Sequence, residues 1–109
     1  MERILICEPH PELRILLEVV VRRAGHEPVG FGELATDDTP PAALILEPAS
    51  AEDLAVAAGL RRRFEDLPII CVSLLEPSAE TTKLAPVAYI VKPFRLRQLE
   101  AALATALAA

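Results

Sequence analysis

Aromatic residues are scarce in this chain of 109 residues, which has no tryptophan, one tyrosine and three phenylalanines. Hydrophobic residues nevertheless make up 52% of the sequence. The core must therefore be built from leucine, isoleucine, valine and alanine. A chain of this length suits one domain with a modest core, so we expect a single domain over residues 1–109.

Basic residues are outnumbered, with 11 Lys and Arg against 16 Asp and Glu and a formal net charge of −5. Proteins that bind nucleic acid usually present a basic surface. This charge balance therefore argues against direct binding to DNA or RNA.

Closely spaced cysteines and long apolar runs are also lacking. Cys7 and Cys71 lie in separate apolar runs, and their spacing fits neither a zinc site nor a redox pair. We expect buried free thiols in a reducing compartment. No apolar run approaches the roughly 20 residues of a membrane-spanning helix, and the first residues lack a signal-peptide core. We therefore expect a cytoplasmic protein that makes no contact with a membrane.

Short apolar runs are present, and they alternate with helical patterns. Runs without polar interruption favour strands that are buried on both faces. A weaker strand at 26–31 contains Pro28, which favours a position at the edge of a sheet. The uninterrupted runs are residues 3–7, 43–46, 67–75 and 87–91.

Three helices are predicted around these strands. Residues 12–24 end before Gly25, a common stop residue, and residues 50–65 begin with Ser50 as N-cap. A last helix spans about 95–108. Alternating strands and helices indicate βαβ units and a parallel α/β sheet. The apolar stripe of the first helix is Leu13, Leu16, Leu17, Val20 and Ala24, and that of the last is Leu96, Leu99, Leu103 and Leu107.

Polar side chains follow several of the predicted strands. Glu8 and His10 come after the first strand, Glu47 after the third, Ser73 near the end of the fourth and Lys92 after the fifth. Ligands of open parallel sheets bind at the carboxyl ends of the strands. Two acids, a hydroxyl and a lysine at one edge could bind a divalent cation and a phosphoryl group.

The order of these segments resembles the receiver domain of bacterial two-component response regulators. The similarity covers nearly the whole chain, and "YIVKPF" at 89–94 is its most specific piece, because the family carries a Lys-Pro there. The resemblance implies a flavodoxin-like, doubly wound sheet of five parallel strands in the order 2-1-3-4-5. Residues 32–42 leave little room for the second helix, which we expect to be missing or shortened, and the fourth helix within 76–86 also looks short.

The resemblance also implies roles for single residues. The family's phosphoacceptor aspartate falls on Glu47, and its acidic metal-binding pair falls on Glu8 and Pro9. The residues that contact the phosphoryl group fall on Ser73 and Lys92, and the aromatic switch residue falls on Tyr89.

Departures from the family's pattern predict that its usual chemistry is lost. Pro9 has no side-chain oxygen, and Glu8 and Glu47 are one methylene longer than aspartate. Mg²⁺ needs near-octahedral oxygens at about 2.0–2.1 Å, and small misplacements of reacting groups can cost on the order of a hundredfold in rate. Leu74 would also crowd the entrance for a phosphoryl group. We therefore expect no cofactor, weak or absent Mg²⁺ binding, and no ordinary phosphorylation of Glu47.

Several alternatives stay open at single positions. Glu47 could mimic a phosphorylated aspartate by pairing with Lys92, or it could be a relic that pairs with Lys92 for structural reasons. Tyr89 could switch rotamers or be a half-buried edge aromatic. His10 could bind a metal with Glu8 and Glu47, or be an exposed loop residue.

The preferred hypothesis is a degenerate receiver that acts as a phosphorylation-independent, non-enzymatic interaction module in a two-component-type pathway. Receivers commonly use the surface of the fourth helix, fifth strand and fifth helix for effectors or dimers. We expect a protein partner, an effector domain or a second copy there. The alternative is a receiver that still accepts a phosphoryl group or binds a metal under the control of a histidine kinase.

Overall fold

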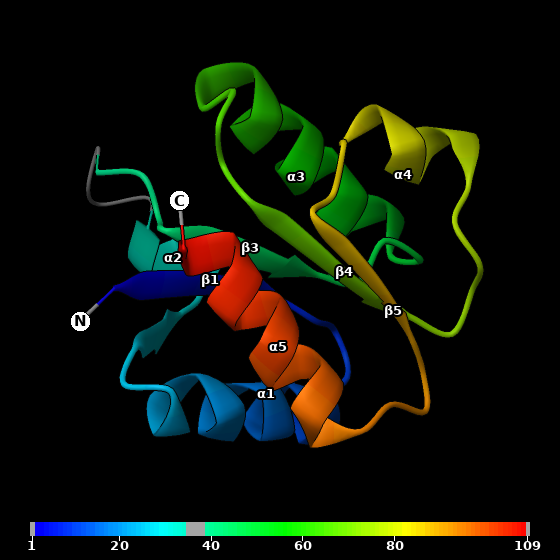
Figure 1. The fold of residues 1–109 in the computed structure, drawn as a ribbon. Helices are drawn as coiled ribbons and strands as arrows, with labels where there is room; N and C mark the ends of the chain where they lie inside the picture. Colours follow the sequence, from blue (N-terminus) through cyan, green and yellow to red (C-terminus); the bar gives the residue numbers. More distant parts are fainter. Residues whose placement is uncertain (1, 35–38, 109) are drawn as a thin grey trace.

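The computed structural model describes residues 2–34 and 39–108. Its parallel strands form one sheet in the order β2-β1-β3-β4-β5, with helices on both faces (Figure 1). The strands are β1 (Arg3–Cys7), β2 (Glu27–Val29), β3 (Ala43–Leu46), β4 (Ile69–Ser73) and β5 (Ala88–Val91). The helices are α1 (Pro11–Arg23), α2 (Phe31–Leu34), α3 (Ala51–Arg63), α4 (Ala79–Lys83) and α5 (Leu96–Leu107). The predicted flavodoxin-like α/β fold and its strand order are confirmed.

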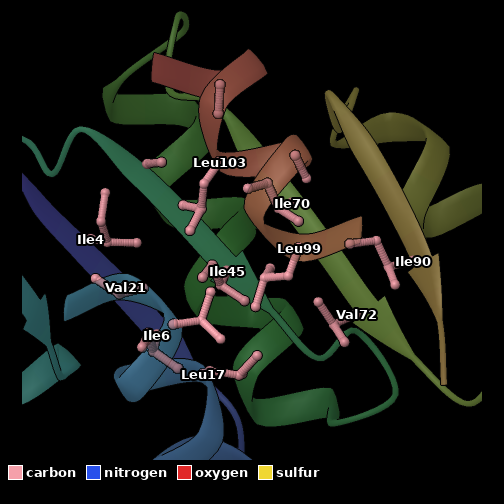
Figure 2. Close-up of a cluster of buried hydrophobic side chains, with 14 residues drawn as sticks. Ile4, Ile6, Leu17, Val21, Ile45, Ile70, Val72, Ile90, Leu99 and Leu103 are labelled. Carbon is pink, nitrogen blue, oxygen red and sulfur yellow. The ribbon is translucent and has the colours of Figure 1, made fainter. Parts of the chain in front are cut away.

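The sheet is buried on both faces, as its uninterrupted apolar strands predict. Alternate side chains of a strand point to opposite faces. Ile45 and Ile70 pack toward α1 and α5 (Figure 2), whereas Leu44 and Ile69 belong to the cluster on the α3 side. The strand β2, which contains Pro28, lies at one edge of the sheet, as predicted.

The helix α1 is fixed by signals at both of its ends. His10 is its N-cap and accepts a hydrogen bond from the Leu13 amide at Nδ1, 3.4 Å away. The chain leaves the helix at Gly25, whose φ of +88° is readily adopted only without a Cβ.

One detail of the predicted stripe on α1 is wrong. The buried side chains are Leu17, Val20 and Val21, whereas Leu16 is 38% exposed and Ala24 lies on the surface. Successive residues are rotated by about 100° around a helix, so a stripe centred between Leu17 and Val21 turns Leu16 away from the sheet.

The second helix is shortened and the fourth helix is short, as predicted. The helix α2 is a single turn, and α4 spans Ala79–Lys83. The end of α4 is held by Arg61 of α3, whose Nε and Nη2 donate to the Leu84 carbonyl at 3.1 and 2.8 Å. In the described ranges, no helix combines the length and the hydrophobicity that crossing a membrane would require.

Candidate functional site

The carboxyl ends of four strands bring the predicted site residues to one edge of the sheet. Glu8 directly follows β1, Glu47 follows β3, Ser73 ends β4 and Lys92 follows β5. The parallel register pairs Cys7 with Leu46 and Ser73 with Val91, so these strands end at nearly the same level. The arrangement depends on the sheet order, because β3 and β4 lie between β1 and β5.

Glu47 is the centre of this site. It is 6% exposed, and both of its carboxylate oxygens are engaged. Its Oε1 accepts hydrogen bonds from Ser73 Oγ at 2.8 Å and from the Ala49 amide at 2.8 Å. Its Oε2 accepts one from Lys92 Nζ at 2.7 Å. One side chain therefore connects the ends of β3, β4 and β5.

Lys92 lies between two buried carboxylates. Its Nζ is 2.7 Å from Glu47 Oε2 and 2.9 Å from Glu8 Oε1. The other oxygen of Glu8 accepts a hydrogen bond from the His10 amide at 3.2 Å. Burial lowers the pKa of Lys92, but the hydrogen bonds that its ammonium donates to Glu47 and Glu8, together with the negative charges of these two side chains, outweigh this effect and hold the pKa above its ordinary value. The ammonium therefore stays charged at neutral pH. The following peptide bond, Lys92–Pro93, is cis.

A hydrogen-bonded chain leads from Glu47 to the surface. Ser73 is fully buried, donates to Glu47 and accepts from the Leu75 amide at 3.1 Å. The hydroxyl of Tyr89 donates to the Leu75 carbonyl at 2.7 Å. Burial raises the pKa of Tyr89 above its ordinary value, so this donor is protonated at neutral pH. Tyr89 is half-buried in this arrangement.

The expected crowding by Leu74 is wrong. Leu74 is 71% exposed, so its side chain extends into solvent. A small cavity of about 50 Å³ beside Ser73 is lined by Leu75 and Tyr89 but not by Leu74. Leu75 lines this cavity but is itself 59% exposed, so the loop after β4 leaves both leucines largely on the surface.

His10 takes a structural position. Its Nδ1 caps α1, and the residue is exposed. Within residues 2–34 and 39–108, no three His, Cys, Asp or Glu side chains are grouped closely enough to hold a metal ion. The alternative of a metal site made by Glu8, His10 and Glu47 is therefore not supported.

Asp53 adds a further acid that the sequence reasoning missed. Burial raises its pKa, a hydrogen bond from Ser50 lowers it, and the charges of Glu52, Glu8 and Glu47 raise it further. Asp53 therefore adds to the negative potential at this edge. The available signal is its place in the first turn of α3, shortly after Glu47 in the sequence.

The two cysteines are buried and free, as predicted. Burial raises the pKa of Cys7 to about 12 and that of Cys71 to about 11. Both thiols are therefore protonated at neutral pH and are poor nucleophiles.

The side chains as arranged do not fit a magnesium ion. Mg²⁺ takes oxygen ligands in near-octahedral geometry. The oxygens of Glu8 and Glu47 all accept hydrogen bonds from protein donors, and the Lys92 ammonium lies between the two carboxylates. Pro9, which is exposed, has no side-chain oxygen to add.

Comparisons with known proteins identify the fold but no close relative. No protein-family model and no curated protein matches the sequence. The chain superimposes on a sensor protein from Polaromonas sp. JS666 with a TM-score of 0.77 and 25% identity, over 98% of this chain and 96% of that one. It superimposes on the receiver domain of a sensor histidine kinase from Pseudomonas aeruginosa, which holds magnesium in its active-site cleft, with a TM-score of 0.81 and 18% identity, over 99% and 98% of the two chains.

A third solved structure is much longer than this chain. NtrX from Brucella abortus matches with a TM-score of 0.82 and 21% identity, over 98% of this chain but only 26% of NtrX. These likenesses show that the chain has the receiver fold.

Proposed function

We propose that this chain is an atypical receiver module that acts in a two-component-type pathway by binding proteins, without being phosphorylated. The observation that carries the proposal is that Glu47 holds Ser73 and Lys92 at the same time. In the family that the chain resembles, these two positions contact the phosphoryl group on the aspartate. Here a permanent carboxylate already engages both of them.

The proposal also rests on the hydrogen bonds that Glu47 would have to break in order to react. Both of its oxygens accept hydrogen bonds from buried or partly buried donors. A nucleophilic attack would require an oxygen to leave Lys92 or Ser73, without a second acid at position 9 to help hold a metal. We therefore propose a cytoplasmic module with no enzymatic activity and no metal cofactor.

Two roles of Glu47 are compatible with this module. A carboxylate carries one charge, whereas a phosphoryl group carries about −1.5 to −2 and has three acceptor oxygens. Glu47 could therefore be a partial mimic of the phosphorylated state, or a structural relic that holds the strand ends together. Both roles make phosphorylation unnecessary, and a variant at position 47 separates them.

The surface of α4, β5 and α5 is our proposed docking site for a partner protein or an effector domain. Val87, Val91 and Leu96 are 48%, 36% and 37% exposed there. Figure 1 shows β5 with α4 along one side and α5 along the other. Tyr89 on β5 is connected to Glu47 through Leu75 and Ser73, so the site and this surface share one hydrogen-bonded chain.

The first experiment asks whether Glu47 reacts. The chain is incubated with acetyl phosphate and Mg²⁺ and its intact mass is measured. We expect no added phosphoryl group, and no amide shift changes at Ser73, Tyr89 or Lys92 in a parallel NMR titration. A phosphoryl group on residue 47 would contradict the proposal.

The second experiment uses Glu47→Gln to distinguish the two roles of Glu47. This variant removes the negative charge of the side chain but keeps its shape. If Glu47 is a mimic, amide shifts and hydrogen exchange change along α4 and β5. If it is a relic, the changes stay at the strand ends. Glu52→Gln, at an exposed position in the first turn of α3, is the matched control.

A further inference from the structure

The outer side of α1 carries an apolar surface that the fold does not cover. Ile15, Leu16 and Val19 are 59%, 38% and 43% exposed. The opposite side of the helix packs on the sheet through Leu17, Val20 and Val21. In Figure 1, α1 lies at the outside of the molecule, and no other element drawn in sequence colours covers its outer side.

Charged residues at the two ends of this surface have opposite sign. Glu12 lies in the first turn of α1, and Arg22 and Arg23 lie in the last turn. Glu12, Ile15, Val19 and Arg22 follow one another at spacings of three and four residues, so they lie along one face of the helix. We call the surface formed by Glu12, Ile15, Leu16, Val19, Arg22 and Arg23 the α1 face.

The charged side chains of the α1 face are unpaired within the part of the chain that the structure describes. Glu12, Arg22 and Arg23 are exposed, and none of them forms an ion pair or a side-chain hydrogen bond with another residue in the ranges 2–34 and 39–108. The face therefore presents an acid at one end, aliphatic side chains in the middle and bases at the other end.

We propose that the α1 face binds the same face of a second copy of this chain, with the two helices antiparallel. A two-fold axis that passes between Ile15 and Val19, at the level of position 17 along the helix, places Ile15 opposite Val19 of the second copy. It also places Glu12 opposite Arg22 of the second copy, and the symmetry repeats both contacts. A parallel pair would instead bring like charges together, which disfavours it.

The expected dimer is weak, because the helix is short. The 13 residues of α1 extend over about 20 Å, so the buried area falls below the roughly 1,200 Å² of a standard interface. A dissociation constant on the order of 0.1 mM is reasonable for such a contact. Because ion pairs flank the apolar centre, association is expected to weaken as salt increases. The inference is independent of Glu47 and of the proposed docking site on α4, β5 and α5.

Sedimentation velocity from about 10 μM to about 1 mM protein at low salt tests the inference, since this range brackets the expected dissociation constant. We expect the wild-type chain to shift from monomer toward dimer. Ile15→Glu places charges at the centre of the contact and should leave only monomer. A wild-type chain that stays monomeric throughout would overturn the inference.

Charge reversal tests the antiparallel arrangement. Glu12→Arg alone, or Arg22→Glu alone, creates two repulsive contacts and should raise the dissociation constant about fivefold or more. An equimolar mixture of the two variants restores opposite charges at both contacts and should dimerise as the wild type does. Failure of the mixture to associate would overturn the antiparallel pairing.

Control variants exclude general effects of charge on a helix. Glu52→Arg and Arg62→Glu make the same reversals at the two ends of α3, which also has 13 residues, and should leave association unchanged. Val87→Asp changes the proposed docking site of the previous section and should also have no effect. Loss of the dimer in Val87→Asp but not in Ile15→Glu would place the contact elsewhere and overturn the inference.

Discussion

The ammonium of Lys92 lies 2.7 Å from Glu47 Oε2, and this contact joins the end of β5 to the end of β3 across the intervening β4. The same nitrogen lies 2.9 Å from Glu8 Oε1. A single cation therefore holds together two buried carboxylates that would repel each other in its absence.

Replacing this cation tests how much the contact contributes. Lys92→Met leaves Glu8 and Glu47 facing each other, and we expect the free energy of unfolding at pH 7 to fall by about 3 kcal/mol, because removing one partner of a buried pair leaves uncompensated charge. Urea denaturation measures the change. Lys83→Met, at an exposed position on α4, should stay within about 0.5 kcal/mol of the wild type.

The deficit of Lys92→Met should depend on pH. Like charges at close range raise the pKa of one carboxylate in the folded variant. Because the pKa is raised in the folded variant, protonation stabilises the folded state. This stabilisation is present at low pH and is lost as pH rises. The difference from the wild type should therefore be smaller at pH 4 than at pH 7. A deficit that grows on acidification would contradict this interpretation of the site.

The buried thiols should contribute to the loss of unfolding free energy at high pH. Burial raises the pKa of Cys7 from 9.0 to about 12 and that of Cys71 from 9.0 to about 11. Both thiols are protonated in the folded state. Their contribution to the free energy of unfolding is therefore fully present below pH 9 and is lost as pH rises through about 11 for Cys71 and about 12 for Cys7. Each thiol contributes at most about 1.4 kcal/mol per pH unit.

Unfolding free energies between pH 8 and pH 10.5 check this expectation. Cys71→Ala should be less stable than the wild type at pH 8 but should lose stability less steeply above pH 9. The pKa of Lys92 is also raised above its ordinary value of 10.5. The contribution of Lys92 to stability is therefore lost only above pH 10.5, outside this interval. Equal slopes for Cys71→Ala and the wild type would show that Cys71 does not titrate as described.

Restoring the family's acids should restore magnesium binding. Pro9→Asp adds an oxygen ligand, and Glu47→Asp shortens the carboxylate so that it no longer spans the distance to both Ser73 and Lys92. We expect the double variant to bind Mg²⁺ measurably in an NMR or calorimetric titration. The single variant Glu47→Asp is the matched control and should bind less. No binding by the double variant would indicate that Lys92 keeps the cation out, since Leu74 extends into solvent.

Two glycines should respond in opposite directions to alanine. Gly25 has φ +88°, a conformation that costs an L-residue about 1–2 kcal/mol, so Gly25→Ala should destabilise the chain by about that amount. Gly59 lies inside α3, where a Cβ would meet only the far end of Arg62 at 3.9 Å. Gly59→Ala should therefore stabilise the chain by about 0.5–1 kcal/mol. Thermal or urea unfolding of both variants compares them directly.

The elements of the fold could be predicted because each is marked by a strong local signal. The uninterrupted apolar runs place the strands, and Ser50 and Gly25 mark a helix start and a helix end that the structure confirms. The meeting of Glu47 and Lys92 could be predicted as well, since the ends of parallel strands share one edge of a sheet.

The finer geometry could not be predicted, because it depends on side-chain rotamers and on tertiary packing. The exposure of Leu74 and that of Leu16 depend on how a loop or a helix is rotated against the sheet. The sequence alone also does not specify which oxygen of Glu47 binds Ser73 and which binds Lys92. These contacts matter for chemistry, because a reaction at either oxygen of Glu47 would change the hydrogen bonds that join the strand ends.

The hydrogen bonds of Arg61 to the Leu84 carbonyl decide how α4 can respond to a change at Ser73. They tether the far end of this short helix to α3, while Leu75, before its near end, is attached through Ser73 and Tyr89. A displacement that begins at Ser73 would consequently rotate α4 about its fixed end at Leu84. The residues between Leu74 and Ser78 would then be displaced the most.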